Sequence, residues 1–197
     1  MLQQKQSALD VVCDNQASID TIDGSVNEIA ANDEFYGEKK LRWAQVACRN
    51  GTIQAIEEGV MTILVCLPTG VGKTLTIACT LNHMDLRKAL KIKGDRPLKV
   101  LFIAHIHRLL TQAERTFADI HNVEIVLRTP FTTIDQTVID DCDIIVMDEA
   151  HHEAMASVQL QLESIRRKPL IGLTATEDRS DGMVIKFERI IKPITRE

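Results

Sequence analysis

The chain has 197 residues, of which 45% are hydrophobic and 26% are charged. This length and composition are typical of one globular domain with a buried core. The sequence has no apolar stretch of about 18 residues, which argues against a membrane span, and its first residues lack the basic and apolar segments of a secretory signal. We therefore expect an intracellular protein, in the cytoplasm, the nucleus or the nucleoid, with no membrane partner.

The net charge of −5 is unevenly distributed along the chain. Residues 1–34 contain seven acidic residues and one lysine, are rich in Asn, Gln and Ser, and predict an acidic, loosely attached leader. A docked helix is the alternative for this segment, because Leu9, Val11 and Val12 could share one face. Residues 35–197 are nearly neutral, which argues against a broad nucleic-acid-coating surface and is compatible with a local basic groove.

Five cysteines are present, an odd number, and no two of them have the spacing of a metal knuckle. Cys66, Cys79 and Cys142 fall in segments that we interpret as core. Buried, reduced thiols in a reducing compartment are the favoured interpretation.

Helical and strand-like segments alternate in the rest of the chain. A helix is predicted within residues 41–59, where Val46, Ile53 and Ile56 recur at helical spacing and Gly59 provides a stop. Five short apolar runs of strand length follow, at residues 62–67, 99–105, 123–127, 143–147 and 169–174. Continuous apolar runs are typical of strands in a sheet that is covered on both faces.

Helical segments are predicted between these strands, at about residues 73–90, 108–120 and 154–166. In the last of them, apolar residues recur at steps of three and four. Strands and helices that alternate in this way form parallel βαβ units. The sequence therefore predicts an α/β fold of three layers with a mainly parallel central sheet of at least five strands.

The first predicted strand leads into a turn, LPTGVGKT, with the composition of a phosphate-binding loop. Glycines let the backbone curl so that several N–H groups point inward, toward the positive end of the following helix. Lys73 would reach the β- and γ-phosphates, and the Thr74 hydroxyl would bind Mg²⁺. The usual pattern starts with Gly or Ala where this chain has Leu67, and a plain strand-to-helix turn with a surface lysine is the alternative. The predicted nucleotide-binding residues of this loop are Pro68, Thr69, Gly70, Val71, Gly72, Lys73 and Thr74.

Two adjacent carboxylates follow the apolar run of DIIVMDEAHH. Asp148 and Glu149 would lie at the carboxyl end of a strand, where ligands bind in open α/β sheets. Asp148 would hold Mg²⁺ through water, and Glu149 would orient and deprotonate an attacking water. The pair follows Lys73 by 75 residues with two predicted strands between, so we predict that Glu149, Lys73 and Asp148 are catalytic and converge at one rim of the sheet.

Two histidine pairs, His105 with His107 and His151 with His152, could suggest a zinc site. Neither pair has the i,i+4 helical spacing together with a third ligand. We instead interpret His151 as a polar contact that couples the catalytic carboxylates to the neighbouring strand.

A third element, GLTATEDRSDG, follows the last predicted strand. LPTGVGKT, DEAHH and LTAT, in this order, resemble motifs I, II and III of superfamily two helicases and translocases, the DEAD/DEAH-box type. TATEDRSDG is similar to the form found in the branch of excision-repair helicases and restriction-enzyme motor subunits, although Glu177 stands where proline is common. The resemblance covers about residues 40–185.

The resemblance implies an N-terminal RecA-like ATP-binding domain that takes ATP and Mg²⁺ and contributes to hydrolysis. It also implies that the LTAT strand lies between the phosphate-loop strand and the acidic strand, where Thr174 and Thr176 could sense the nucleotide state. LRWAQ is similar to the family's L-R-x-x-Q segment, in which the glutamine, here Gln45, recognises adenine. The family usually has Pro-Tyr where this chain has Trp43-Ala44, and a plain amphipathic helix start is the alternative.

Two further segments imply contacts with nucleic acid. FIAHIHRLLTQA resembles motif Ia, with His105 and Arg108 as candidates. PFTTIDQT resembles the next strand-contacting motif, whose candidates here are Thr132, Thr133 and Gln136. Such groups bind the phosphate backbone without reading sequence. The form of the third motif favours DNA over RNA.

Motors of this family use a second RecA-like domain, which carries arginines that complete the ATP site. Only fifteen residues follow Gly182, too few for such a domain, so we expect it elsewhere in the same gene product or in trans. Because an arginine of this kind can contribute roughly 10³–10⁵ in rate, we expect the chain alone to bind nucleotide, hydrolyse it feebly and unwind nothing. A nucleotide-dependent regulatory or docking module without motor activity is the alternative function, and a P-loop kinase fits poorly.

Overall fold

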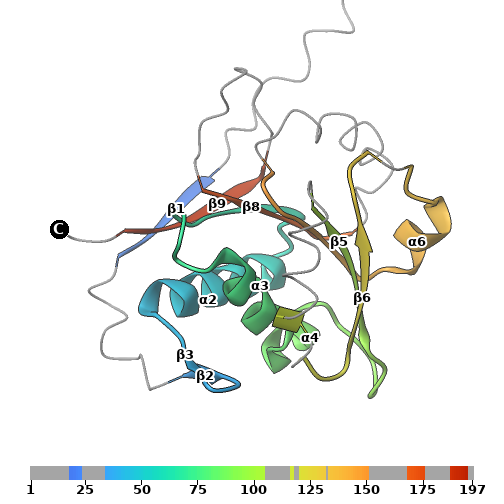
Figure 1. Cartoon of the computed structure of the whole chain (residues 1–197), viewed down its shortest axis with the longest axis horizontal. Coiled ribbons are helices and arrows are strands. Elements are labelled where there is room, and N and C mark those ends of the chain that lie inside the picture. The colour runs from blue at the N-terminus through green and yellow to red at the C-terminus, as the bar shows by residue number, and fades with distance from the viewer. Residues whose placement is uncertain are drawn as a thin grey trace, which may run out of the picture.

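The computed structural model shows one large sheet with helices packed against it (Figure 1). Among its described residues, no helix is long and apolar enough to cross a membrane. The structure describes residues 34–104, 116–117, 120–131, 133–150, 168–175 and 187–193 in full, and residues 18–23 and 194 by their backbone.

The central sheet has seven strands in the order β1-β9-β4-β8-β7-β5-β6, and every pair of neighbours is parallel. All five strands that the apolar runs predict are present, within two residues of the predicted bounds. The strands are β1 (Ser18–Asp23), β4 (Thr62–Cys66), β5 (Leu98–Ile103), β6 (Val123–Arg128), β7 (Ile144–Met147), β8 (Leu170–Thr174) and β9 (Arg189–Ile194). Strand β8 lies between β4 and β7, as the helicase resemblance implied.

Two strands of the central sheet, β1 and β9, were not predicted. Residues 18–23, which the sequence analysis placed in a loosely attached leader, form β1 and pair with β9 in register from Ser18↔Arg189 to Asp23↔Ile194. The remainder of the predicted leader, up to residue 33, lies outside the described residues. A short antiparallel hairpin, β2 (Phe35–Tyr36) and β3 (Lys39–Lys40), then precedes the first helix.

The helices that the structure describes with both ends are α2 (Trp43–Glu57), α3 (Lys73–Leu81), α4 (Met84–Ala89) and α6 (Gln136–Asp141). Helix α2 confirms the helix predicted within 41–59, and it stops before Gly59, which has φ +86°. The single helix predicted over 73–90 is wrong, because the chain divides at His83. His83 has an extended backbone and is the N-cap of α4. Its Nδ1 accepts a hydrogen bond from the N–H of Asp85, so α4 begins as a separate helix.

The other predicted helices, 108–120 and 154–166, fall on residues that the structure largely leaves undescribed. Helix α6 was not predicted, because six residues are too few to show a helical repeat.

Side chains of the strands alternate between two apolar layers, one on each face of the sheet. Ile63 and Val65 pack with α2, α3 and α4, whereas Leu64 and Cys66 pack with α6 on the other face. Figure 1 shows α2, α3 and α4 grouped together and α6 apart from them, beside β6. The connections β4-α3-β5 and β6-α6-β7 run in opposite directions across the sheet, so right-handed crossovers place α3 and α6 on opposite faces. The predicted three-layer α/β fold is therefore confirmed.

Gly172 lies in the middle of β8, paired with Leu64 of β4 and Met147 of β7. A Cβ added there would lie 2.5 Å from Cζ of Phe187 and 3.1 Å from Cβ of Ala150. We predict that Gly172→Ala lowers the free energy of unfolding by about 1–3 kcal/mol, as overpacking of a core typically does, measured by urea denaturation.

The matched control is the double variant Gly172→Ala with Phe187→Leu, because leucine lacks the Cζ atom that the new methyl group would strike. The loss of stability in the double variant should be smaller than the sum of the losses in Gly172→Ala and Phe187→Leu alone. Unchanged stability in Gly172→Ala would contradict the packing described for β8.

Candidate nucleotide site

The phosphate loop connects β4 to α3 and depends on two glycines in left-handed backbone conformations. Gly70 has φ +83° and Gly72 has φ +93°, a region that is strained for residues with a Cβ. Gly72 is the N-cap of α3, and its carbonyl accepts hydrogen bonds from both the N–H and the hydroxyl of Thr76, at 2.9 and 3.1 Å. Lys73 is the first residue of α3, so the loop delivers it to the positive end of a nine-residue helix.

Leu67, which departs from the usual loop pattern, directly follows β4 and continues its pairing with β8. Its side chain is fully buried in the core, and its N–H donates to the carbonyl of Thr174 at 2.9 Å. The loop itself therefore starts at Pro68, and the departure at Leu67 leaves its glycines and lysine in place.

The acidic pair lies in a turn that directly follows β7. The N–H of Asp148 donates to the carbonyl of Ile103 on β5, and the N–H of Ala150 donates to the carbonyl of Leu173 on β8. Between them, Glu149 has φ +52°, uncommon for a residue with a side chain, and its N–H donates to Oδ1 of Asp148 at 3.0 Å. The turn is thus bonded to both neighbouring strands, which fixes both carboxylates at the carboxyl edge of the sheet.

The phosphate loop and the acidic pair meet at this edge. Nζ of Lys73 lies 3.1 Å from Oε1 of Glu149, and their side chains are 13% and 24% exposed. Residues 76 positions apart in sequence are therefore in direct contact, and the loop and the carboxylates open on the same rim. Thr74 follows Lys73 in the first turn of α3 and is partly buried.

Asp148 is the most buried carboxylate of the site, and its residue is only 6% exposed. Burial raises its pKa from 3.8 to about 6, with a further increase from the neighbouring charge of Glu149 and an opposing effect of Lys73. A hydroxyl at Thr74 and a carboxylate at Asp148 are hard oxygen donors of the kind that Mg²⁺ prefers, so the residues present fit this cation.

Thr174 ends β8 between the strands that carry the two halves of the site. It is buried, lies opposite Cys66 in the register with β4, and accepts the hydrogen bond from Leu67 through its carbonyl. The other predicted coupling residues, Thr176 and His151, lie outside the described residues.

Gln45 is placed differently from the exposed position that a base-reading residue would suggest. It is 2% exposed, its Oε1 accepts from the N–H of Arg42 at 2.8 Å, and its Nε2 donates to the carbonyl of Val71 in the phosphate loop at 2.9 Å. Neither contact was predicted, although a glutamine three residues after a helix N-cap can accept from the N-cap N–H, as Gln45 does from Arg42. Its role toward adenine stays a prediction.

The predicted nucleic-acid residues are only partly described, since His105, Arg108 and Thr132 lie outside the described ranges. Thr133 and Gln136 are exposed near the start of α6, after β6. Three strands separate β6 from β4, so these two residues do not join the Lys73–Glu149 cluster. Nε2 of Gln136 donates to Oδ1 of Asp140 at 2.9 Å, which already engages part of its amide.

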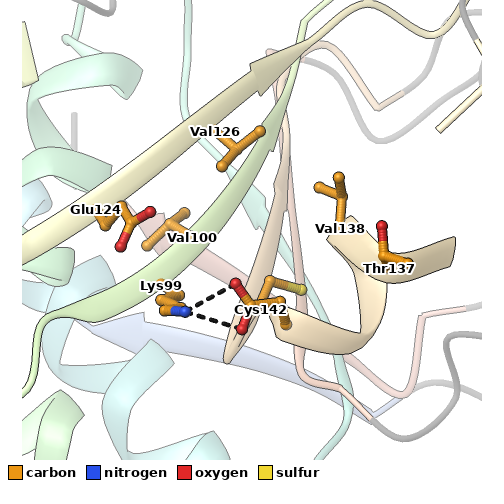
Figure 2. Close-up of a pocket in the computed structure, with 8 residues that line it drawn as sticks. Lys99, Val100, Glu124, Val126, Thr137, Val138 and Cys142 are labelled. Atoms are coloured by element: carbon orange, nitrogen blue, oxygen red, sulfur yellow. Dashed lines mark hydrogen bonds and ion pairs between the residues drawn. The ribbon is translucent and has the colours of Figure 1, made fainter. Parts of the chain in front are cut away.

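A separate pocket of about 430 Å³ lies between α6 and strands β5 and β6 (Figure 2). Among the residues that line it, Nζ of Lys99 contacts both carboxylate oxygens of Asp141 at 2.8 Å. Lys99 and Glu124 stand next to the amino ends of their strands, whereas the acidic pair follows the carboxyl end of β7. The described residues that line this pocket include none of the predicted site residues.

The chain is similar in sequence to a known protein family and to a curated protein. Residues 38–134 match the ResIII family, described as "Type III restriction enzyme, res subunit". Over 178 residues the chain is 25% identical to IRC3 of Saccharomyces cerevisiae, whose full name is "Putative ATP-dependent helicase IRC3". The match covers 77% of this chain and 26% of IRC3, so the chain spans about a quarter of the length of this relative.

Solved structures of helicases are also similar to the chain. The UvsW helicase of bacteriophage T4 has a TM-score of 0.49 at 18% identity, covering 86% of this chain and 66% of that one. A DEAD box protein from Methanococcus jannaschii has a TM-score of 0.44 at 13% identity, covering 79% of this chain and 55% of that one.

A parallel α/β sheet whose glycine-containing loop and acidic pair meet at the carboxyl edge is typical of P-loop nucleotide-binding domains. Together with this geometry, the ResIII match over residues 38–134 and the similarity to a curated helicase support an ATP-binding lobe of helicase or translocase type, as the motifs indicated.

The raised pKa of Asp148 leads to a prediction about stability without metal. Between pH 3.8 and about 6 the folded state holds a proton that the unfolded state has released, so stability falls as the pH rises through this window. In a chelating buffer near pH 7.5, Asp148→Asn should therefore raise the free energy of unfolding by up to about 3 kcal/mol. Below about pH 4 the carboxyl is protonated in both states, and the gain should vanish.

Urea denaturation at the two pH values measures this difference, with Asp95→Asn in the exposed turn before β5 as the control. If Asp148→Asn were less stable than the native chain near pH 7.5, the carboxylate would be stabilising and the prediction would be wrong.

Proposed function

We propose that this chain binds Mg-ATP and contributes to its hydrolysis as one lobe of a nucleic-acid-dependent motor, a DNA helicase or translocase. The observation that supports this most strongly is the 3.1 Å contact between Lys73 of the phosphate loop and Glu149 of the acidic pair. A lysine and a carboxylate from distant parts of the chain, both partly buried, meet where the positive end of α3 favours an anion.

In the proposed ATP complex, the triphosphate replaces Glu149 as the partner of the Lys73 ammonium. The N–H groups of the loop hold the phosphates, and Thr74 and Asp148 provide oxygens for Mg²⁺. When bound, Mg²⁺ would neutralise charge on the β- and γ-phosphates. Glu149, released from the lysine, orients the attacking water and accepts its proton.

The activity of the whole motor requires groups beyond this site. We propose that a second RecA-like domain, in the same gene product or in trans, supplies arginines to the ATP site. His105, Arg108, Thr132, Thr133 and Gln136 are proposed to contact the nucleic-acid backbone, with DNA favoured over RNA. Thr174, Thr176 and His151 would couple the two sites, since Thr174 ends the strand that separates the loop from the carboxylates.

Removal of the lysine tests the phosphate site directly. Lys73→Ala should weaken binding of a fluorescent ATP analogue by at least about tenfold, because the principal cation of the site is lost. Lys93→Ala, in the exposed segment before β5, is the matched control and should bind like the native chain. Equal Mg²⁺-dependent binding by Lys73→Ala and the native chain would remove the assignment of this loop to phosphate.

Glu149→Gln tests the proposed base. Glutamine keeps the size of the side chain, cannot take a proton from water, and no longer attracts the Lys73 ammonium by charge. We expect the variant to bind the ATP analogue at least as tightly as the native chain and to lose hydrolysis, measured under single-turnover conditions with the protein in excess over labelled ATP. Residual hydrolysis equal to that of the native chain would exclude Glu149 as the base, and fast multiple turnover by the native chain would contradict the need for a second domain.

A further inference from the structure

The segment that connects α4 to β5 carries a concentration of positive charge (Figure 1). Residues 87–96, which we call the cationic turn, contain one carboxylate, that of Asp95, and five cations, in a chain whose net charge is −5. The cations are Arg87, Lys88, Lys91, Lys93 and Arg96. Positive charge gathered in this way on a protein of negative net charge indicates a local site for an anionic partner.

The two arginines of the cationic turn hold its backbone in place. The guanidinium of Arg87 donates to three backbone carbonyls, at 3.3, 3.4 and 2.6 Å, which are those of Asn122, Gly94 and Arg96. The guanidinium of Arg96 forms two hydrogen bonds with the carboxylate of Asp143, at 2.8 and 2.7 Å. The turn is therefore fixed to α4 and to the residues that precede β6 and β7, before any partner binds.

Two lysines of the turn have no carboxylate partner among the described residues. Lys88 contacts Asp85 at 2.6 Å. Lys91 and Lys93, in contrast, form no ion pair within the part of the chain that the structure describes, and both are exposed. Ile92, between them, packs against the core on the face of the sheet that carries α2 and α3. Because the residue between them is anchored inward, both ammonium groups stay accessible to a partner.

The backbone of Lys91 is left-handed, with φ +55°. This is the position after a helix C-cap that glycine usually occupies, since the N–H of Ile92 donates to the carbonyl of Arg87 and closes the last turn of α4. A lysine is less stable there than a glycine. The helix end does not require its charge, because Arg87 and Lys88 already lie in the last turn. A lysine kept at a cost in stability points to a function for its charge.

The cationic turn lies at the edge of the sheet opposite to the candidate nucleotide site. It leads into Leu98, the first residue of β5, whereas Lys73 and Glu149 follow the carboxyl ends of β4 and β7. The strands are parallel and β5 has six residues, so the two edges are about 20 Å apart. A partner bound at the turn would therefore leave the nucleotide site open.

We propose that the cationic turn binds the phosphate backbone of nucleic acid, as a contact separate from the residues near the start of α6. This inference rests on the proposed function for its choice of partner, because a nucleic-acid-dependent motor works on a polyanion. Exposed lysines on a rigid surface turn suit an extended chain of phosphates, since each lysine neutralises a phosphate and releases its counterions. The contact is independent of base sequence, and it keeps the lobe on the polymer whether or not a nucleotide is bound.

The test is binding of fluorescein-labelled single-stranded and duplex DNA, followed by fluorescence anisotropy over a range of salt concentrations. Lys91→Gln combined with Lys93→Gln removes both charges that lack a described partner. At about 50 mM salt the double variant should bind DNA at least about tenfold more weakly than the native chain. The slope of the logarithm of affinity against the logarithm of salt concentration should become less steep by about 1 to 2.

Two controls separate the site from overall charge. Lys39→Gln combined with Lys40→Gln removes the same charge from two exposed residues of the β2-β3 hairpin and should bind DNA like the native chain. Lys91→Arg combined with Lys93→Arg keeps the charge of the turn and should do the same.

Lys91→Gly separates the site from folding. Glycine relieves the left-handed backbone, so this variant should unfold at a higher temperature than the native chain. It should nevertheless bind DNA more weakly, with a salt slope that is less steep by about 1. A contribution of Lys91 to folding alone would instead leave DNA binding unchanged.

Several outcomes would overturn the inference. Native affinity for DNA in the variant with both glutamines would do so, and so would an equal loss in the hairpin control, because overall charge would then explain the effect. Displacement of labelled DNA by polyglutamate as effectively as by unlabelled DNA would assign the turn to acidic protein segments. If the native chain binds no DNA at low salt, the inference fails while the Mg-ATP site can stand. If Lys73→Ala binds the ATP analogue like the native chain, the proposed function fails whether or not the turn binds DNA.

Discussion

The position of β8 between β4 and β7 is the constraint on which the whole site depends. Parallel strands release their loops at one edge, so the phosphate loop after β4 and the acidic turn after β7 emerge on the same rim. The end of β8 then bonds to both: the carbonyl of Thr174 accepts from Leu67 before the phosphate loop, and the carbonyl of Leu173 accepts from Ala150 after the acidic pair. The contact between Lys73 and Glu149 therefore spans a strand whose end is attached to each half of the site. A shift of β8 would move both halves, which gives a physical basis for coupling through this strand.

The site combines several features that each cost stability. Asp148 is a buried carboxylate with a raised pKa, Glu149 has a left-handed backbone, and Gly70 and Gly72 give up the conformational restriction that a side chain would provide. These costs are tolerated because the surrounding sheet is buried on both faces, with apolar layers against α2, α3 and α4 on one side and α6 on the other. The buried sheet holds the ammonium of Lys73 and the carboxylate of Glu149 at its carboxyl edge, in the positions where we propose that a phosphate ligand binds.

The same burial on both faces explains which parts of the fold could be predicted from the sequence. Strands β4, β5, β6, β7 and β8 are continuous apolar runs, so they were predicted within two residues. Strand β1 has the sequence SIDTID and, among the described strands, pairs with β9 alone, so it lacks such a run. Strand β9 contains Lys192 and Pro193, which lie beyond its pairing with β4 and can therefore be polar or lack an N–H. The interruption at His83 was missed for a local reason, because a histidine is a weaker helix-stop signal than glycine or proline.

For the site, the sequence could predict which residues meet but not how each is held. The convergence of Lys73 with Glu149 follows from strand order, which the motifs imply, and the contact could be expected before any coordinates. The contact of Gln45 with Val71 follows instead from how closely α2 packs on the loop and α3, a tertiary distance that no periodicity encodes. Motif resemblance assigned Gln45 to the base, whereas the geometry engages its amide with the backbone. The motif therefore indicates which residue lies at the site, whereas the bonds of its amide to Arg42 and Val71 are known only from the structure.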